Sequence, residues 1–175
     1  RGSGEGRGEC TIDVAKGQAP VLALNSNLSG IVLALPEVGW KKAANGKGKL
    51  TIAATLGAVP EVQKLSFSAD GLSAQGRMSF NASGGLKEAR FDRFQVGKWL
   101  DAGVRLTGRG KGKAVGVALT DGRLDLRQMS LGKSAGKGGE AGALSVALDR
   151  VTVSESIALT GFRGSFTSKG GFSGN

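Results

Sequence analysis

Strict alternation of apolar and polar residues is the feature that most constrains the fold of this chain. In the segment 72–80, Leu72, Ala74, Met78 and Phe80 alternate with Ser, Gln and Arg side chains. The same period of two recurs at 50–56, 65–69, 115–120, 144–148 and 157–161. Successive side chains of a β-strand point to opposite faces of the sheet, so this pattern predicts strands with one apolar and one polar face.

Turn signals separate these alternating runs. Asp70-Gly71, Gly84-Gly85, Asp121-Gly122 and Gly170-Gly171 stand between successive segments. Such pairs tolerate the positive φ angles of tight hairpins. The 31 glycines and only 3 prolines also suit many turns and uninterrupted strands. We therefore predict an all-β fold, an extended antiparallel β-sheet of roughly a dozen strands.

The domain organisation is predicted to be simple. We expect residues 1–175 to form a single segment, cut from a larger protein, because the chain ends in what reads as half a hairpin. Weak self-similarity predicts repeat units at 50–127 and 143–175. The segments 36–49 and 132–142, rich in Gly, Lys and small residues, are predicted to be flexible loops.

The composition argues against an enzyme. The chain has no histidine and one cysteine, Cys10, so it lacks the commonest acid–base catalyst, the usual zinc ligands and an internal disulfide. Asp121 and Asp125 could be taken for a catalytic pair, but turn chemistry explains Asp121-Gly122 without catalysis. We expect no cofactor and no metal. No apolar run approaches the ~18–20 residues of a membrane-spanning helix.

The charge is strongly basic, with 24 Lys and Arg against 14 Asp and Glu, a net charge of +10. Such an excess favours anionic partners. The basic residues cluster at 41–49 and at 105–113, where we expect solvated hairpin loops. Contact with anionic lipid head groups is an alternative for both clusters. Nucleic-acid binding is a third, against which stands the absence of interleaved aromatic residues for base stacking.

An apolar sheet face must be covered by something. Closure of the sheet on itself, a second sheet, a helical layer or bound lipid would each serve. The pattern offers no long helix, and aromatic residues make up only 5% of the chain. Trp40 and Trp99, in or near predicted loops, are expected to have a packing role.

Five stretches, in this order, carry a resemblance to a known family. They are LPEVGWKKAANGKGKL (35–50), FSADGLSAQGRMSF (67–80), ARFDRFQVG (89–97), VALTDGRLDLR (117–127) and, after a glycine-rich gap, LSVALDRVTVSESIALTGFRGSF (144–166). Together they resemble the AsmA-like proteins of Gram-negative envelopes, especially the long YhdP-type members. The resemblance covers roughly four fifths of the chain.

The resemblance implies a twisted, taco-shaped, repeating β-groove in the periplasm whose hydrophobic concave face conducts phospholipid in outer-membrane biogenesis. It implies no catalytic residues, and anchoring to the inner membrane through a segment not present in this chain. The partners it implies are phospholipid acyl chains, anionic head groups at the basic loops and the rest of the longer chain; no nucleic acid is expected. The residues expected to contact lipid are Leu72, Ala74, Met78, Phe80, Val115, Val117, Leu119, Leu144, Val146, Leu148, Ile157 and Leu159.

Two other functions remain open at this point. A structural or adhesive β-solenoid-like repeat would use the apolar face as solid core and bind no ligand. A basic nucleic-acid-binding β domain would bind with a steep dependence on salt.

Overall fold

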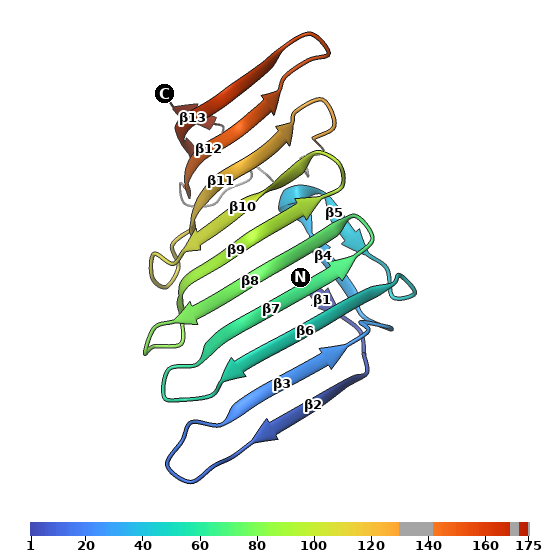
Figure 1. The fold of residues 1–175 in the computed structure, drawn as a ribbon, viewed down its shortest axis with the longest axis vertical. Helices are drawn as coiled ribbons and strands as arrows, with labels where there is room; N and C mark the ends of the chain where they lie inside the picture. Colours follow the sequence, from blue (N-terminus) through green and yellow to red (C-terminus); the bar gives the residue numbers. More distant parts are fainter. Residues whose placement is uncertain (130–141, 169–171, 175) are drawn as a thin grey trace.

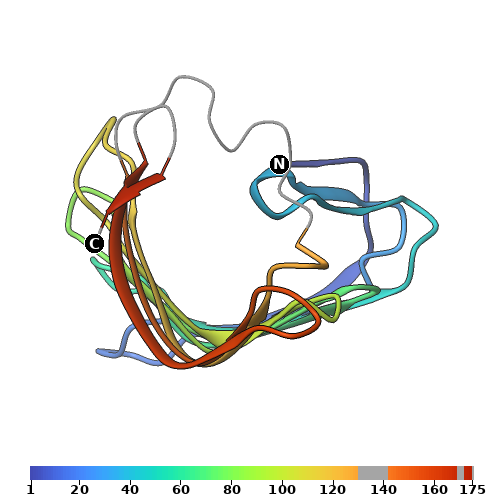
Figure 2. The ribbon, with the colours of Figure 1, turned by 90° about the horizontal axis from the view of Figure 1, so that it is seen from above.

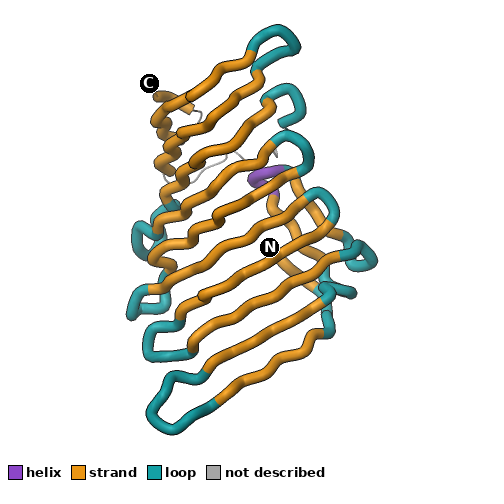
Figure 3. Tube along the Cα trace, viewed as in Figure 1, coloured by secondary structure: helices purple, strands orange, loops and turns teal. Residues whose placement is uncertain are grey.

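The computed structural model describes residues 1–129, 142–168 and 172–174, and this part of the chain is almost entirely β-structure (Figure 3). Its one helical element there is a short 3-10 turn, η1 (Pro36–Val38). The strands are β1 (Gly2–Ser3), β2 (Gly8–Asp13), β3 (Val21–Ser26), β4 (Val32–Leu35), β5 (Trp40–Lys42), β6 (Gly48–Thr55), β7 (Glu61–Ala69), β8 (Leu72–Phe80), β9 (Leu86–Val96), β10 (Leu100–Thr107), β11 (Gly116–Asp125), β12 (Gly142–Thr152), β13 (Ala158–Ser168) and β14 (Phe172–Gly174).

Eleven strands form one open main sheet, in the order β14-β13-β12-β11-β10-β9-β8-β7-β6-β3-β2 (Figure 1). From β6 to β11, each strand pairs antiparallel with the next one along the chain. The predicted all-β, extended sheet is therefore confirmed. Asp70-Gly71 and Gly84-Gly85 lie in the β7–β8 and β8–β9 turns, as expected, and Gly170-Gly171 lies outside the described residues.

One pair departs from the predicted antiparallel arrangement. β11 and β12 run parallel, with Val117 opposite Leu144 and Leu124 opposite Val151. A tight turn cannot join parallel neighbours, so β11 and β12 do not form a hairpin. The alternation within a strand is the same for either direction, and for that reason the sequence pattern did not predict this pair.

The main sheet is curved, with a concave and a convex side (Figure 2). β-Bulges accompany the curvature. Two residues of β7 face one residue of β8, two of β9 face one of β10, and two of β11 face one of β10. Bulges bend a strand and raise its local twist, so a row of them folds a flat sheet into a trough.

The bulge in β11 corrects a sequence prediction. Asp121 and Gly122 were expected to separate two strands, but they lie inside β11, with φ angles of 57° and 80°. An Asp-Gly pair supplies the same positive φ angles to a bulge as to a hairpin turn, so its local signal cannot distinguish the two.

A second sheet, of three strands in the order β1-β4-β5, lies over the concave side of the main sheet (Figure 2). We call these strands and η1 the covering sheet. It occupies much of 36–49, where a flexible loop was predicted. Trp40 fixes it in place: the Trp40 indole Nε1 donates to the Asp70 carbonyl in the β7–β8 turn at 2.8 Å, and its ring meets Phe67 edge-on at 5.7 Å.

Lys42 also departs from the prediction that the basic cluster is solvated. Its side chain is 4% exposed. The ammonium donates to the carbonyls of Leu28, Ile31 and Ala43 at 2.7, 3.0 and 3.1 Å. An ammonium has three donors, so these bonds satisfy it fully. Lys42 therefore holds the 28–31 loop to the covering sheet.

The predicted loop at 132–142 lies outside the described residues except for Gly142, which begins β12.

Candidate functional site

The concave side of the main sheet is its apolar side. The covering sheet lies on that side and packs Leu33, Leu35, Val38 and Trp40 into the hydrophobic core cluster. The other members of that cluster come from one face of β7 to β13, apart from Trp99 and Met129, which lie just outside the strands. We call this face of the main sheet the concave apolar face.

Two rows of side chains cross the concave apolar face at right angles to the strands. The inner row, next to the covering sheet, consists of Leu72, Val96, Leu100, Leu124, Val151 and Leu159, each directly opposite the next. The outer row, nearer the other ends of the strands, consists of Ile12, Leu22, Ala54, Val62, Met78, Ala89, Leu106, Val117, Leu144 and Phe166.

The outer row contains no polar residue from β2 to β13. At ~4.8 Å per strand, its nine steps span roughly 43 Å. Its larger members are only half-buried, and Ile12 at the sheet edge is 53% exposed. It therefore forms an unbroken apolar path along the whole sheet, and much of its surface is open.

The inner row is different because protein covers most of it. Leu72, Val96, Leu100 and Val151 are buried beneath Trp40, Trp99 and the covering sheet. Met129, after β11, packs against the same core cluster. The two tryptophans have the packing position that their sequence context predicted. This half of the concave apolar face is an ordinary protein core.

The residues expected to contact lipid are thus divided between open and covered surfaces. Met78, Val117 and Leu144 belong to the half-exposed outer row, and Phe80 and Leu119 are half-buried on the same face. Five further strand residues were expected to contact lipid, and four of them are deeply buried. The fifth, Leu159 at the end of the inner row, is 41% exposed. The five residues are Leu72, Ala74, Val146, Leu148 and Leu159. Leu148 has no exposed surface, so it supports the fold and does not meet a ligand in this conformation.

Two expected contact residues lie outside the strands. Val115 precedes β11 and is 37% exposed, and Ile157 precedes β13 and is 53% exposed. Each is the first residue of its alternating run and lies one residue before the strand begins. The structure therefore places both in turns at the ends of the concave apolar face and not on it.

Sequence reasoning missed several members of the open path. Ile12, Leu22, Val62 and Leu106 belong to the outer row but were not among the expected contacts. A bulge interrupts the alternation of β7, and Ile12 is the only aliphatic side chain of β2. The row becomes visible only when the registers of all strands are known.

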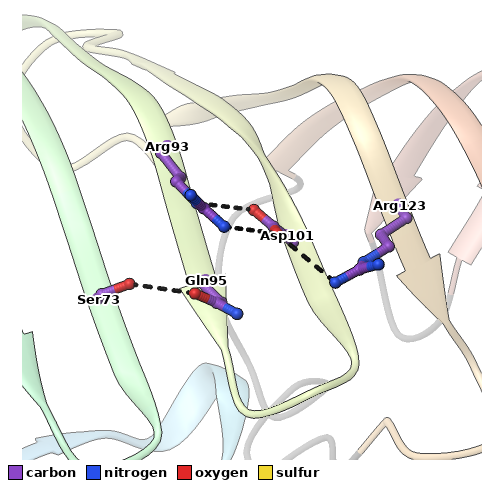
Figure 4. A network of polar contacts seen from close by, with 5 residues as sticks. All are labelled: Ser73, Arg93, Gln95, Asp101 and Arg123. Carbon is purple, nitrogen blue, oxygen red and sulfur yellow. Dashed lines mark hydrogen bonds and ion pairs between the residues drawn. The ribbon is translucent and has the colours of Figure 1, made fainter.

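The convex side is polar. Arg93 donates to both carboxylate oxygens of Asp101, at 3.2 and 3.0 Å, and Arg123 lies 3.8 Å from the same carboxylate (Figure 4). Ser73 donates to Gln95 at 3.5 Å on the neighbouring strands. Arg90, Arg105, Asp121 and Asp149 line a hollow of about 380 Å³ on this side. The two sides of the sheet are therefore chemically distinct.

Asp121 and Asp125 have separate roles. Asp121 is exposed in the β11 bulge, whereas Asp125 binds Arg127 through a 2.6 Å ion pair. The hydrogen bond from the Arg127 side chain lowers the pKa of Asp125 and raises that of Arg127. A carboxylate held ionised in this way is a structural ion-pair partner and a poor proton donor.

Within 1–129, 142–168 and 172–174, acidic, cysteine and histidine side chains form no group of three that could hold a metal ion. In the same ranges no helix has the length and apolar character to cross a bilayer.

No protein-family model, curated protein or solved structure matches the chain. Its function must therefore be inferred from its own fold and surfaces.

Proposed function

We propose that this chain is a segment of a lipid-transport protein, in which phospholipid acyl chains lie along the outer row of the concave apolar face. The observation that carries the proposal is the outer row itself: apolar side chains from ten strands form it without interruption, and its larger members are half-exposed. Exposed apolar surface of this extent marks a binding surface in most soluble proteins.

The energetics suit passive transport. Burial of each CH₂ group is worth ~0.8 kcal/mol, so an acyl chain would be held firmly by contact along several strands. The outer row offers that chain no hydrogen-bonding side chain. Movement from strand to strand then exchanges one apolar contact for another and breaks no polar bond. The segment needs no catalytic residues for this role.

The same proposal includes the family and the location. The order of sequence motifs resembles AsmA-like, YhdP-type proteins, and the curved open sheet has the form expected of their groove. On that basis the segment acts in the periplasm in outer-membrane biogenesis, in a protein anchored to the inner membrane through another segment.

The test is native mass spectrometry of the purified chain, with lipid extraction from the same sample. We expect co-purifying phospholipid in the wild type and its loss in Val117→Glu, because this places a carboxylate in the outer row. Ala118→Glu is the matched control: Ala118 is the next residue along β11, on the convex side opposite Arg105. A lipid-free wild type, or equal lipid in both variants, would reject the proposal.

The covered inner row favours a second candidate, a structural or adhesive β-repeat without a ligand. In that case the outer row would be covered by other parts of a longer chain. A lipid-free chain that unfolds in one cooperative transition and binds no added phospholipid would support this candidate.

A further inference from the structure

The β10–β11 turn, residues 108–115, carries a concentrated positive charge. Arg109, Lys111 and Lys113 lie within it, and no acidic residue occurs in the chain between Asp101 and Asp121. We call residues 108–115 the basic turn. All three of these side chains are exposed.

The basic turn borders the open half of the concave apolar face. Leu106 and Val117 of the outer row are paired with each other, and Thr107 and Gly116 form the last pair before the turn. Lys111 is five residues after Leu106, and Lys113 is four residues before Val117. At ~3.4 Å per residue, their Cα atoms lie within roughly 17 Å of the outer row, and the long side chains can shorten that distance.

These two ammonium groups lack an ion-pair partner within the described part of the chain. Glu88, which is paired with Thr107 at this end of the sheet, has its carboxylate 4.0 Å from Arg105. The turn is held to the neighbouring strand through its backbone instead: the Gly108 N–H donates to the Lys87 carbonyl at 3.0 Å. Lys111 and Lys113 thus lie in the turn that follows the outer-row pair Leu106–Val117, and no ion pair among the described residues involves them.

We infer that the basic turn binds the phosphate of a lipid head group whose acyl chains lie on the outer row, so that the segment prefers anionic phospholipids. A phospholipid has the matching arrangement, with an anionic group next to long apolar chains. The inference rests on the proposed function and adds a charge preference to it. Each lysine is expected to contribute on the order of fivefold in affinity for an anionic lipid.

The test uses vesicles of equal amounts of dioleoyl-phosphatidylglycerol and dioleoyl-phosphatidylcholine, which differ in head-group charge but not in acyl chains. The full chain is incubated with these vesicles and separated from them, and bound lipid is quantified by mass spectrometry. The test variant is Lys111→Gln/Lys113→Gln. The matched control is Lys49→Gln/Lys64→Gln, which removes the same charge from exposed positions on the convex side.

We expect the wild type and the control to extract phosphatidylglycerol in at least a fivefold excess, and the test variant to extract both lipids nearly equally. Total lipid bound should change little. An equal preference in the test variant and the control would overturn the inference and leave the proposed function standing. Extraction of neither lipid by the wild type would overturn both, and adherence to intact vesicles without extraction would do the same.

Discussion

At the scale of single residues, Lys42 shows how one side chain can have a role opposite to that of its neighbours. It belongs to a run of lysines in the sequence, yet it is buried and bonded to three backbone carbonyls. Lys41, the adjacent residue, is exposed. The alternation of a short strand, β5, decides which of the two points inward.

Replacement of Lys42 by Met should therefore destabilise the protein. Methionine keeps the length of the side chain but leaves the Leu28, Ile31 and Ala43 carbonyls without their donor, a loss of about 2 kcal/mol. Lys41→Met should change the free energy of unfolding by less than about 0.5 kcal/mol. Urea denaturation of both variants measures the difference. Similar values for the two would show that the Lys42 hydrogen bonds do not hold the 28–31 loop.

The ion pair between Asp125 and Arg127 should make the stability of the protein depend on pH. The pKa of Asp125 is lowered in the folded state, chiefly by the hydrogen bond from Arg127. A lowered pKa contributes stability above the ordinary carboxylate pKa, and this contribution is lost as the pH falls through the folded-state value. Between about pH 5 and 2, the free energy of unfolding should fall less steeply in Asp125→Asn than in the wild type. Arg127→Gln removes the same pair and should flatten the curve similarly. Unchanged acid sensitivity in both variants would contradict this role.

At the scale of elements, the bulges connect the sequence to the curvature. Gly122 in the β11 bulge has a φ of 80°, and a Cβ atom there would lie 2.1 Å from the Asp101 carbonyl oxygen. Only glycine allows β10 and β11 to approach so closely at the bend.

Gly122→Ala should therefore destabilise the protein by more than the strain of a positive φ angle alone, because the added Cβ also meets the Asp101 carbonyl oxygen. Gly112→Ala is the control, because Gly112 has a similar φ of 78° but no residue beyond its chain neighbours lies within 4 Å of the place a Cβ would take. We expect about 1 kcal/mol for Gly112→Ala, from the left-handed conformation, and more than about 2 kcal/mol for Gly122→Ala. Thermal unfolding compares the two. Equal costs would mean that the bulge can relax, and that the close approach does not fix the curvature.

The same elements show how far the sequence could predict the fold. Strands such as β8 follow from alternation alone, since each face has one character. The covering sheet could not be predicted from alternation. Its strands β4 and β5 are only four and three residues long, and they depend on tertiary contacts through Trp40. The parallel direction of β12 relative to β11 leaves no periodic signal in either strand, so alternation could not predict it.

At the scale of the whole molecule, one curved sheet combines a covered half and an open half on the same face. Leu148 and Val117 were both expected to contact lipid, and both lie on that face. The sequence could not distinguish the covered Leu148 from the half-exposed Val117, because burial depends on what lies above a strand.

The most direct test of the central claim is site-specific photo-crosslinking of lipid. A benzophenone amino acid is placed at Met78 or Val117 in the outer row, or at Gln75 or Ala118 on the convex side, and the chain is irradiated with phospholipid. The account predicts lipid adducts at the two outer-row positions and few at the two convex ones. Equal labelling on both sides, or none at the outer row, would contradict a lipid-carrying concave apolar face.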